Sequence, residues 1–237
     1  MTNTRRPICI LGAMDAEIRE FLKHSDITNE EDWNEFVFRE GKLCDTDVVI
    51  VKSGVGKVFA AMVSEKIIDE YNPKAVVFTG VGGGLNPTLE IGDVVVSSDC
   101  IQHDLDAEAL GFPRGQIPYT EHRVFVSDRN LLRTALQTKL KGHKIFAGRI
   151  LTGDQFITKK EMKDHKYLID DLKGDVVEME GGAIAQVCTI TKTPFLIVRT
   201  ISDKANGEAV EDFNAFSDVV AKNSFEVTQT ILKGIHS

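Results

Sequence analysis

Short runs of apolar and β-branched residues recur along the whole chain, and they limit its possible folds more than any other feature. Runs that are apolar without alternation are typical of strands buried on both faces, as in mostly parallel sheets. We therefore predict a central sheet built largely from parallel strands. The runs lie at Ile8–Leu11, Val48–Val51, Ala75–Phe78, Val94–Val96, Lys144–Leu151, Val176–Met179 and Pro194–Val198.

Between several of these runs, apolar residues follow helical spacing. The alternation of strands and helices favours one α/β domain over residues 1–237, with a mixed, mostly parallel sheet flanked by helices. The polar segment Gln102–Tyr119 is predicted to be a long functional loop, because loops of this length commonly act as lids or contact surfaces. The predicted helices lie at Asp15–His24, Val58–Tyr71, Asp128–Leu140, Gly181–Thr191 and Phe213–Leu232.

The composition argues against several classes of partner and site. With 28 basic and 36 acidic residues the net charge is −8, which disfavours nucleic acid and anionic membranes. No apolar stretch is long enough for a membrane span. The four cysteines lack zinc-ligand spacing, so we expect reduced thiols, a cytoplasmic protein and no metal or cofactor. The residues His103-Asp104-Leu105-Asp106 are interpreted as a hydrogen-bonded turn rather than a metal site.

The residues that follow the predicted strands indicate a ligand pocket, because ligands of open α/β sheets bind beyond the carboxyl ends of strands. Glycines follow some strands and carboxylates follow others: Glu17, Glu178, Glu180 and Asp203. Each carboxylate alone could simply lie at a helix N-terminus, where negative charge is favoured. Together they suit hydrolysis of a glycosidic bond, which needs an acid for the leaving group and a base for water. The residue pattern leaves both interpretations open.

A series of motifs in a fixed order carries a resemblance to a known family. The motifs are GAMDAE from Gly12, SGVGK from Ser53, TGVGGGL from Thr79, PTLEIGD from Pro87, HD from His103, GQIP from Gly115, GDQFI from Gly153, VEME from Val177 and VRTISD from Val198. Over nearly its whole length the chain resembles the 5′-methylthioadenosine/S-adenosylhomocysteine nucleosidases of the purine nucleoside phosphorylase superfamily. The resemblance implies a nucleoside phosphorylase-like fold. It also implies hydrolysis of the N-glycosidic bond of these nucleosides, releasing adenine and a thioribose, without a cofactor.

The resemblance also implies roles for individual residues. Glu17 would activate water, and Asp203 would protonate adenine N7 with Ser202 orienting its carboxylate. Glu180 would bind the ribose hydroxyls, and Arg199 would lie near the water. Glu178 shares the motif but is expected to be structural. The remaining implied substrate contacts are Gly82, Gly83, the backbone of Ile157, and Met14, Val55, Phe156, Met179 and Phe213.

Two positions depart from the family pattern. Val81 and Gly82 stand where the family often has serine and alanine, which removes a hydroxyl near the expected water. Asp15-Ala16 replaces a more acidic pair, a change expected to be harmless. The resemblance further implies a homodimer, in which the long loop closes the partner's 5′ pocket through Ala107, Leu110 and Pro118.

Three alternative functions stay open. A nucleoside phosphorylase of the same fold would use phosphate in place of water, but phosphate needs cationic donors and would meet the carboxylate of Glu17. A sibling hydrolase could act on a futalosine-type nucleoside. A non-catalytic nucleoside-binding protein would be expected to have lost Glu17 or Asp203, and both are present.

Overall fold

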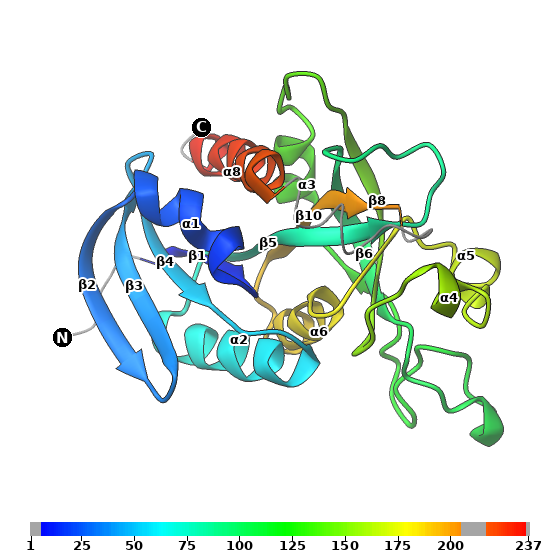
Figure 1. Cartoon of the computed structure of the whole chain (residues 1–237). Helices are drawn as coiled ribbons and strands as arrows, with labels where there is room; N and C mark the ends of the chain where they lie inside the picture. Colours follow the sequence, from blue (N-terminus) through cyan, green and yellow to red (C-terminus); the bar gives the residue numbers. More distant parts are fainter. Residues whose placement is uncertain (1–5, 205–216, 236–237) are drawn as a thin grey trace.

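Each apolar run predicted to be a strand belongs to one continuous sheet in the computed structural model, which describes residues 6–204 and 217–235 (Figure 1). Alternate residues of these runs face opposite sides of the sheet. Ile8 and Ile10 belong to one core cluster, whereas Cys9 and Leu11 belong to the other. The runs are continuously apolar because both faces are buried. These strands are β1 (Ile8–Gly12), β4 (Thr46–Lys52), β5 (Ala75–Gly84), β6 (Val94–Gln102), β8 (Ile145–Thr152), β9 (Val176–Glu178) and β10 (Phe195–Asp203).

Three further strands were not predicted. β2 (Asp26–Trp33) and β3 (Phe36–Leu43) form an antiparallel hairpin that continues the sheet beyond β4. β2 lies at the edge of the sheet with a mostly exposed, acidic sequence, so no hydrophobic pattern marks it. β7 (Phe125–Val126) is a two-residue strand beside β6.

The sheet is mixed, as predicted, and part of it closes on itself. β5 pairs in parallel with β1 and β10, and β8 pairs in parallel with β6 and β9. β10 also pairs antiparallel with β6, and β9 pairs antiparallel with β5. These pairings join β5, β10, β6, β8 and β9 into a ring, with β1, β4, β3 and β2 extending from β5.

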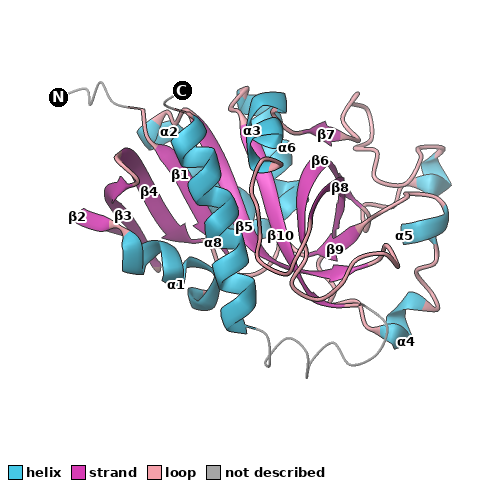
Figure 2. Ribbon diagram, turned by 90° about the horizontal axis from the view of Figure 1, so that it is seen from above, coloured by secondary structure: helices cyan, strands magenta, loops and turns pink. Residues whose placement is uncertain are grey.

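Helices cover both faces of the sheet (Figure 2). α1 (Asp15–His24) and α6 (Gly181–Thr191) have the predicted bounds, and α2 (Lys57–Tyr71) begins one residue earlier than predicted. α3 (Arg129–Ala135) ends well before the predicted Leu140. After its last residue, Thr138 Oγ1 donates to the carbonyl of Ala135 at 2.8 Å. α8 (Ser217–Gly234) forms the described part of the last predicted helix.

The two short helices α4 (Lys159–Met162) and α5 (Tyr167–Asp170) follow β8 and were not predicted. Segment Gln102–Tyr119 begins at the last residue of β6 and continues as a loop, interrupted by the 3₁₀ turn η1 (Glu108–Leu110). Residues of α1, α3 and α8 pack on one face of the sheet, and residues of α2 and α6 pack on the other. Within the described ranges, no helix is long and apolar enough to cross a membrane.

Candidate active site

A cleft of about 730 Å³, counting its open mouth, lies where the ends of several strands converge. This volume is within the usual range for a small-molecule site. Val55 and Phe156 lie at its mouth and are about half exposed, at 50% and 47%. The lining residues are Ala13, Met14, Glu17, Val55, Val81, Gly82, Gly83, Gln155, Phe156, Ile157, Val177, Glu178, Met179, Glu180, Ser202 and Asp203.

Glu17 is a buried carboxylate held by main-chain donors. It stands in the first turn of α1, directly after β1, and its Oε2 accepts from the N–H groups of Ala13 (2.7 Å) and Met14 (3.0 Å). Its Oε1 accepts from the N–H of Val81 on β5 (3.0 Å). Burial raises the pKa of Glu17, while the Arg199 guanidinium and these N–H groups act in the opposite direction. The hydroxyl that Val81 lacks is therefore not needed to hold Glu17, because Val81 contributes through its backbone.

Gly80 provides the space in which Glu17 and Arg199 approach each other. A Cβ atom at this position would lie 2.4 Å from Glu17 Oε1 and 2.6 Å from Arg199 Nη1. Both distances are far shorter than a van der Waals contact, and Glu17 and Arg199 are both buried. Any side chain at position 80 would therefore displace the carboxylate, the guanidinium or both.

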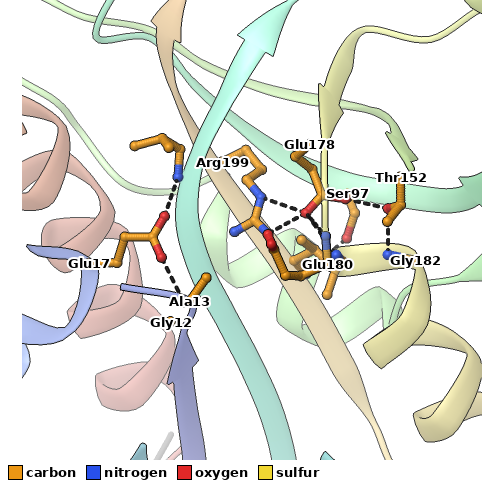
Figure 3. Close-up of polar contacts among 12 residues, drawn as sticks. Gly12, Ala13, Glu17, Ser97, Thr152, Glu178, Glu180, Gly182 and Arg199 are labelled. Atoms are coloured by element: carbon orange, nitrogen blue, oxygen red, sulfur yellow. Dashed lines mark hydrogen bonds and ion pairs between the residues drawn. The ribbon is translucent and has the colours of Figure 1, made fainter. Parts of the chain in front are cut away.

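Arg199 lies behind the cleft surface and is held by a network of side chains (Figure 3). Its Nε and Nη2 donate to Glu178 Oε2, and its guanidinium carbon lies 4.1 Å from the centre of the Phe78 ring. Arg199 Nη1 is buried and has no hydrogen-bond partner among the residues that the structure describes. Since a buried donor without an acceptor is costly, Nη1 is suited to a group bound next to Glu17.

Both oxygens of the Glu178 carboxylate accept hydrogen bonds. Besides Arg199, its Oε2 accepts from the N–H groups of Glu180 (3.0 Å) and Gly181 (2.7 Å) at the start of α6. Its Oε1 accepts from the hydroxyl of Thr152, which in turn accepts from the N–H of Gly182 at 2.6 Å. The Glu178 carboxylate thus joins β8, β10 and α6.

Glu180 faces the cleft from the residue that precedes α6. Its Oε1 accepts from the N–H of Gly56, at the start of α2, at 2.8 Å. Its Oε2 lies 3.7 Å from Arg199 Nη2. Burial, followed by repulsion from Glu178, raises the pKa of Glu180. A ligand that donates hydrogen bonds to this carboxylate would favour its ionised form.

Asp203 ends β10 and borders the cleft with its carboxylate nearly fully buried. The hydroxyl of Ser202 donates to Asp203 Oδ2 at 2.9 Å, the contact that the motif led us to expect. β10 has an irregular register against β5 between Ile201 and Asp203. This irregularity lies where both Ser202 and Asp203 reach the cleft.

Most of the predicted site residues come together in this cleft, but some do not. Arg199 lies behind the surface instead of lining it, and Phe213 is outside the described residues. Ala107, Leu110 and Pro118 are not among the residues that line the cleft of their own chain.

Among the residues that sequence reasoning missed are five that line or support the cleft. Ala13, Gln155 and Val177 line the cleft, while Gly80 and Gly56 act behind it. All five stand inside motifs that were already recognised, but their spacing alone gave no reason to select them.

The His103-Asp104 motif is a hydrogen-bonded structure at the cleft rim. Asp104 accepts from Lys57 Nζ (2.7 Å) and from the N–H of Asp154 (2.9 Å). His103 Nδ1 lies 3.1 Å from the Tyr167 hydroxyl, and burial lowers the pKa of His103 to about 4. Among the described residues, no group of His, Cys, Asp and Glu has an arrangement that could hold a metal ion.

Comparisons with known proteins agree with this geometry. The family model described as the phosphorylase superfamily matches residues 7–233. The 5′-methylthioadenosine/S-adenosylhomocysteine nucleosidase of Bacillus subtilis (strain 168) is 34% identical over 232 residues, which are 97% of this chain and 99% of that protein.

Two solved structures of nucleosidases with the same activity are closely similar. The enzyme from Colwellia psychrerythraea 34H, in complex with adenine, has a TM-score of 0.91 and 35% identity, covering 98% of this chain and 96% of that chain. The enzyme from Neisseria meningitidis, in complex with methylthio-immucillin-A, has a TM-score of 0.90 and 33% identity, covering 96% and 99%.

Proposed function

This chain belongs to the phosphorylase superfamily and, within it, to the 5′-methylthioadenosine/S-adenosylhomocysteine nucleosidases, and on that basis we propose that it hydrolyses the N-glycosidic bond of these two nucleosides. The products are adenine and the corresponding thioribose. We further propose that residues 1–237 act as one domain in the cytoplasm, in keeping with the four free cysteines.

The observation that carries hydrolysis rather than phosphorolysis is the charge of the cleft. Glu17, Glu178, Glu180 and Asp203 line it, and within the described part of the chain its lining includes no Lys, Arg or His side chain. The guanidinium of Arg199, behind the surface, is already paired with Glu178. A phosphate ion would be repelled by these carboxylates and would lack the donors that bind it in proteins. Water is the nucleophile that this cleft can accept.

Glu17 is the proposed base. Its oxygens already receive main-chain N–H groups, which fix the carboxylate in one orientation. A water between Glu17 Oε1 and Arg199 Nη1 would donate a proton to the first and accept a hydrogen bond from the second. Because burial raises the pKa of Glu17, its carboxylate is a stronger base than an ordinary glutamate.

Asp203 is the proposed acid, and it acts on the leaving group. Departing adenine would carry negative charge, which protonation at N7 neutralises, so a proton donor beside the base lowers the barrier. The hydroxyl of Ser202 donates to Asp203 Oδ2, which orients the carboxyl group at the edge of the cleft where adenine would bind. Glu17 and Asp203 thereby divide the roles of base and acid.

The remaining contacts bind the two halves of the nucleoside. The Glu180 carboxylate accepts hydrogen bonds from the ribose hydroxyls, with Met179 packed on the ribose. The backbone of Ile157 reads the polar edge of adenine, and Phe156 packs near the base. Gly82 and Gly83 let the main chain approach the nucleoside, while Met14 and Val55 complete the wall.

We propose that the protein works as a homodimer, in which Ala107, Leu110 and Pro118 complete the partner's 5′ pocket. Exposed large apolar side chains support this assembly, because exposed apolar patches often mark protein–protein contacts. On α2, Val58 is 78% exposed, and in the long loop Leu110 is 66% exposed. An apolar contribution from the partner suits a thioalkyl substituent.

Adenine release from 5′-methylthioadenosine in phosphate-free buffer tests the proposed function. We expect rapid release with free methylthioribose as the co-product, and no sugar 1-phosphate when phosphate is added. Release that requires phosphate would assign the protein to the phosphorylases. Binding of the nucleoside without release under either condition would indicate a non-catalytic binding protein.

A further inference from the structure

Three segments at the rim of the cleft are joined by a closed triangle of hydrogen bonds. Lys57 is the first residue of α2, Asp104 lies in the loop after β6, and Asp154 lies in the loop after β8. Lys57 Nζ donates to Asp104 Oδ1 (2.7 Å), and the N–H of Asp154 donates to Asp104 Oδ2 (2.9 Å). The N–H of Lys57 donates to Asp154 Oδ1 (2.8 Å), which closes the triangle.

Two of the three side chains in the triangle are partly shielded from solvent, whereas Asp154 is exposed. The side chains of Lys57 and Asp104 are only 19% and 28% exposed. Burial opposes ionisation of Asp104, but the donors from Lys57 and Asp154 outweigh it and hold the pKa of Asp104 below its usual range. Asp104 is therefore an ionised acceptor with both oxygens engaged, the arrangement that makes hydrogen bonds strong.

Each of the two segments that Asp104 binds leads directly to the proposed nucleoside site. Gly56, next to Lys57, donates its N–H to Glu180 at 2.8 Å. Asp154 is followed by Gln155, Phe156 and Ile157, which form one wall of the cleft. Asp104 itself is not among the lining residues.

A second contact ties the same motif to the same wall. The His103 ring packs directly on Gly153, where a Cβ atom would lie 2.3 Å from His103 Nε2. His103 and Asp104 thus hold consecutive residues of the loop after β8, one by packing and one by a hydrogen bond. A side chain at position 153 would overlap the imidazole ring of His103, so only glycine fits there.

We propose that Asp104 is a positioning residue, which sets the distance between the Phe156–Ile157 wall and Glu180 by binding Asp154 and Lys57 together. Asp104 acts through these neighbours, without touching the substrate. That the Phe156–Ile157 wall binds adenine and that Glu180 binds ribose rests on the proposed function. Loss of the Asp104 contacts would loosen the wall and weaken nucleoside binding before it affects the chemistry.

The test combines kinetics with amide hydrogen exchange on two variants, Asp104→Asn and Lys57→Met. In each variant we expect KM for 5′-methylthioadenosine to rise about tenfold, the effect of one charge-assisted hydrogen bond, with a smaller change in kcat. The backbone amides of residues 154–157 should exchange faster. The two changes should not add in the double variant, because both break the same contact.

Asp99→Asn is the matched control. Asp99 lies on β6, the strand that leads to Asp104, and pairs with Arg149 at 2.6 Å with similar exposure, 17% and 29%, but it does not line the cleft. It should leave KM and the exchange of residues 154–157 unchanged. The proposal is overturned if Asp104→Asn and Lys57→Met leave both quantities unchanged, or if Asp99→Asn alters them equally. A wild-type protein that releases no adenine would refute the proposed function, while amide exchange would still decide the role of Asp104.

Discussion

Two buried carboxylates flank the same guanidinium, and they are held in different ways. Within the described part of the chain, Glu17 accepts hydrogen bonds from the main-chain N–H groups of Ala13, Met14 and Val81. Glu178 accepts from the side chains of Arg199 and Thr152 as well as from the main chain. Figure 3 shows the two on opposite sides of the β5 ribbon in that view.

The difference indicates how each region responds to substitution. Because no side chain donates to Glu17 in these contacts, changing the side chains of its donors should matter little. An added Cβ that displaces the backbone or the carboxylate should matter much more. Around Glu178 the opposite holds, since a single side chain can remove the charge that Arg199 requires. The surroundings of Glu17 are therefore sensitive to added side-chain volume, and those of Glu178 are sensitive to loss of charge.

Replacing Glu178 with glutamine should produce the largest effect on stability. Arg199 would become a buried cation without its main counter-ion, and breaking a buried ion pair from one side costs about 3–5 kcal/mol. Urea unfolding measures this loss. Glu30→Gln, which breaks the exposed pair with Arg39, should cost at most about 1 kcal/mol. Equal losses in the two variants would show that the network around Arg199 contributes no more than a surface ion pair.

Gly80→Ala should lower kcat/KM by about 100-fold, the effect of a displacement of roughly 1 Å at reacting groups. The new methyl group would occupy space now filled by Glu17 Oε1 and Arg199 Nη1. Steady-state adenine release gives the rate. Gly84→Ala on the same strand is the control, because its Cβ would meet nothing nearer than Ile201 Cγ2 at 3.3 Å. If Gly80→Ala is as active as Gly84→Ala, the space above Gly80 does not position Glu17.

The pH dependence should show activity and stability changing in opposite directions. A base must be ionised, and burial raises the pKa of Glu17 above 4.5, so kcat/KM should fall on acidification before an ordinary glutamate would titrate. The same raised pKa means that the folded state binds the proton more tightly than the unfolded state. This contribution to stability is complete below the unfolded-state pKa and is lost as pH rises through the folded-state pKa. Full activity retained down to about pH 4.5 would contradict a raised pKa for the base.

Val81→Ser should have the smallest effect, less than about threefold in kcat/KM. The substitution restores the hydroxyl that the family pattern often has, but Val81 contributes its backbone N–H to Glu17. That N–H is present in both proteins, so the contact that holds Glu17 is unchanged. A large gain in rate would show that the side chain at position 81, rather than the main chain, limits the use of water.

The sequence allowed the central strands to be predicted because their burial on both faces leaves an unbroken apolar run, as at Ile8–Leu11. It gave no such indication for β2, an edge strand that is mostly exposed and acidic and that pairs only with β3. The strand-end carboxylates could be found from their positions after those runs. The requirement for glycine at position 80 could not, since it depends on where residues 17 and 199 meet in space. For the same reason, the triangle around Asp104 joins residues too far apart in sequence for any local pattern.

The catalytic rate of the Glu17→Gln variant tests the central claim most directly. If the carboxylate held by main-chain donors is the base, kcat for 5′-methylthioadenosine should fall about 1000-fold, within the range for loss of a general base. Adenine affinity, measured by calorimetry, should change by less than about threefold, because the lost interaction belongs to the transition state. A variant that keeps kcat within about tenfold of wild type would show that another group activates water, and would contradict the account.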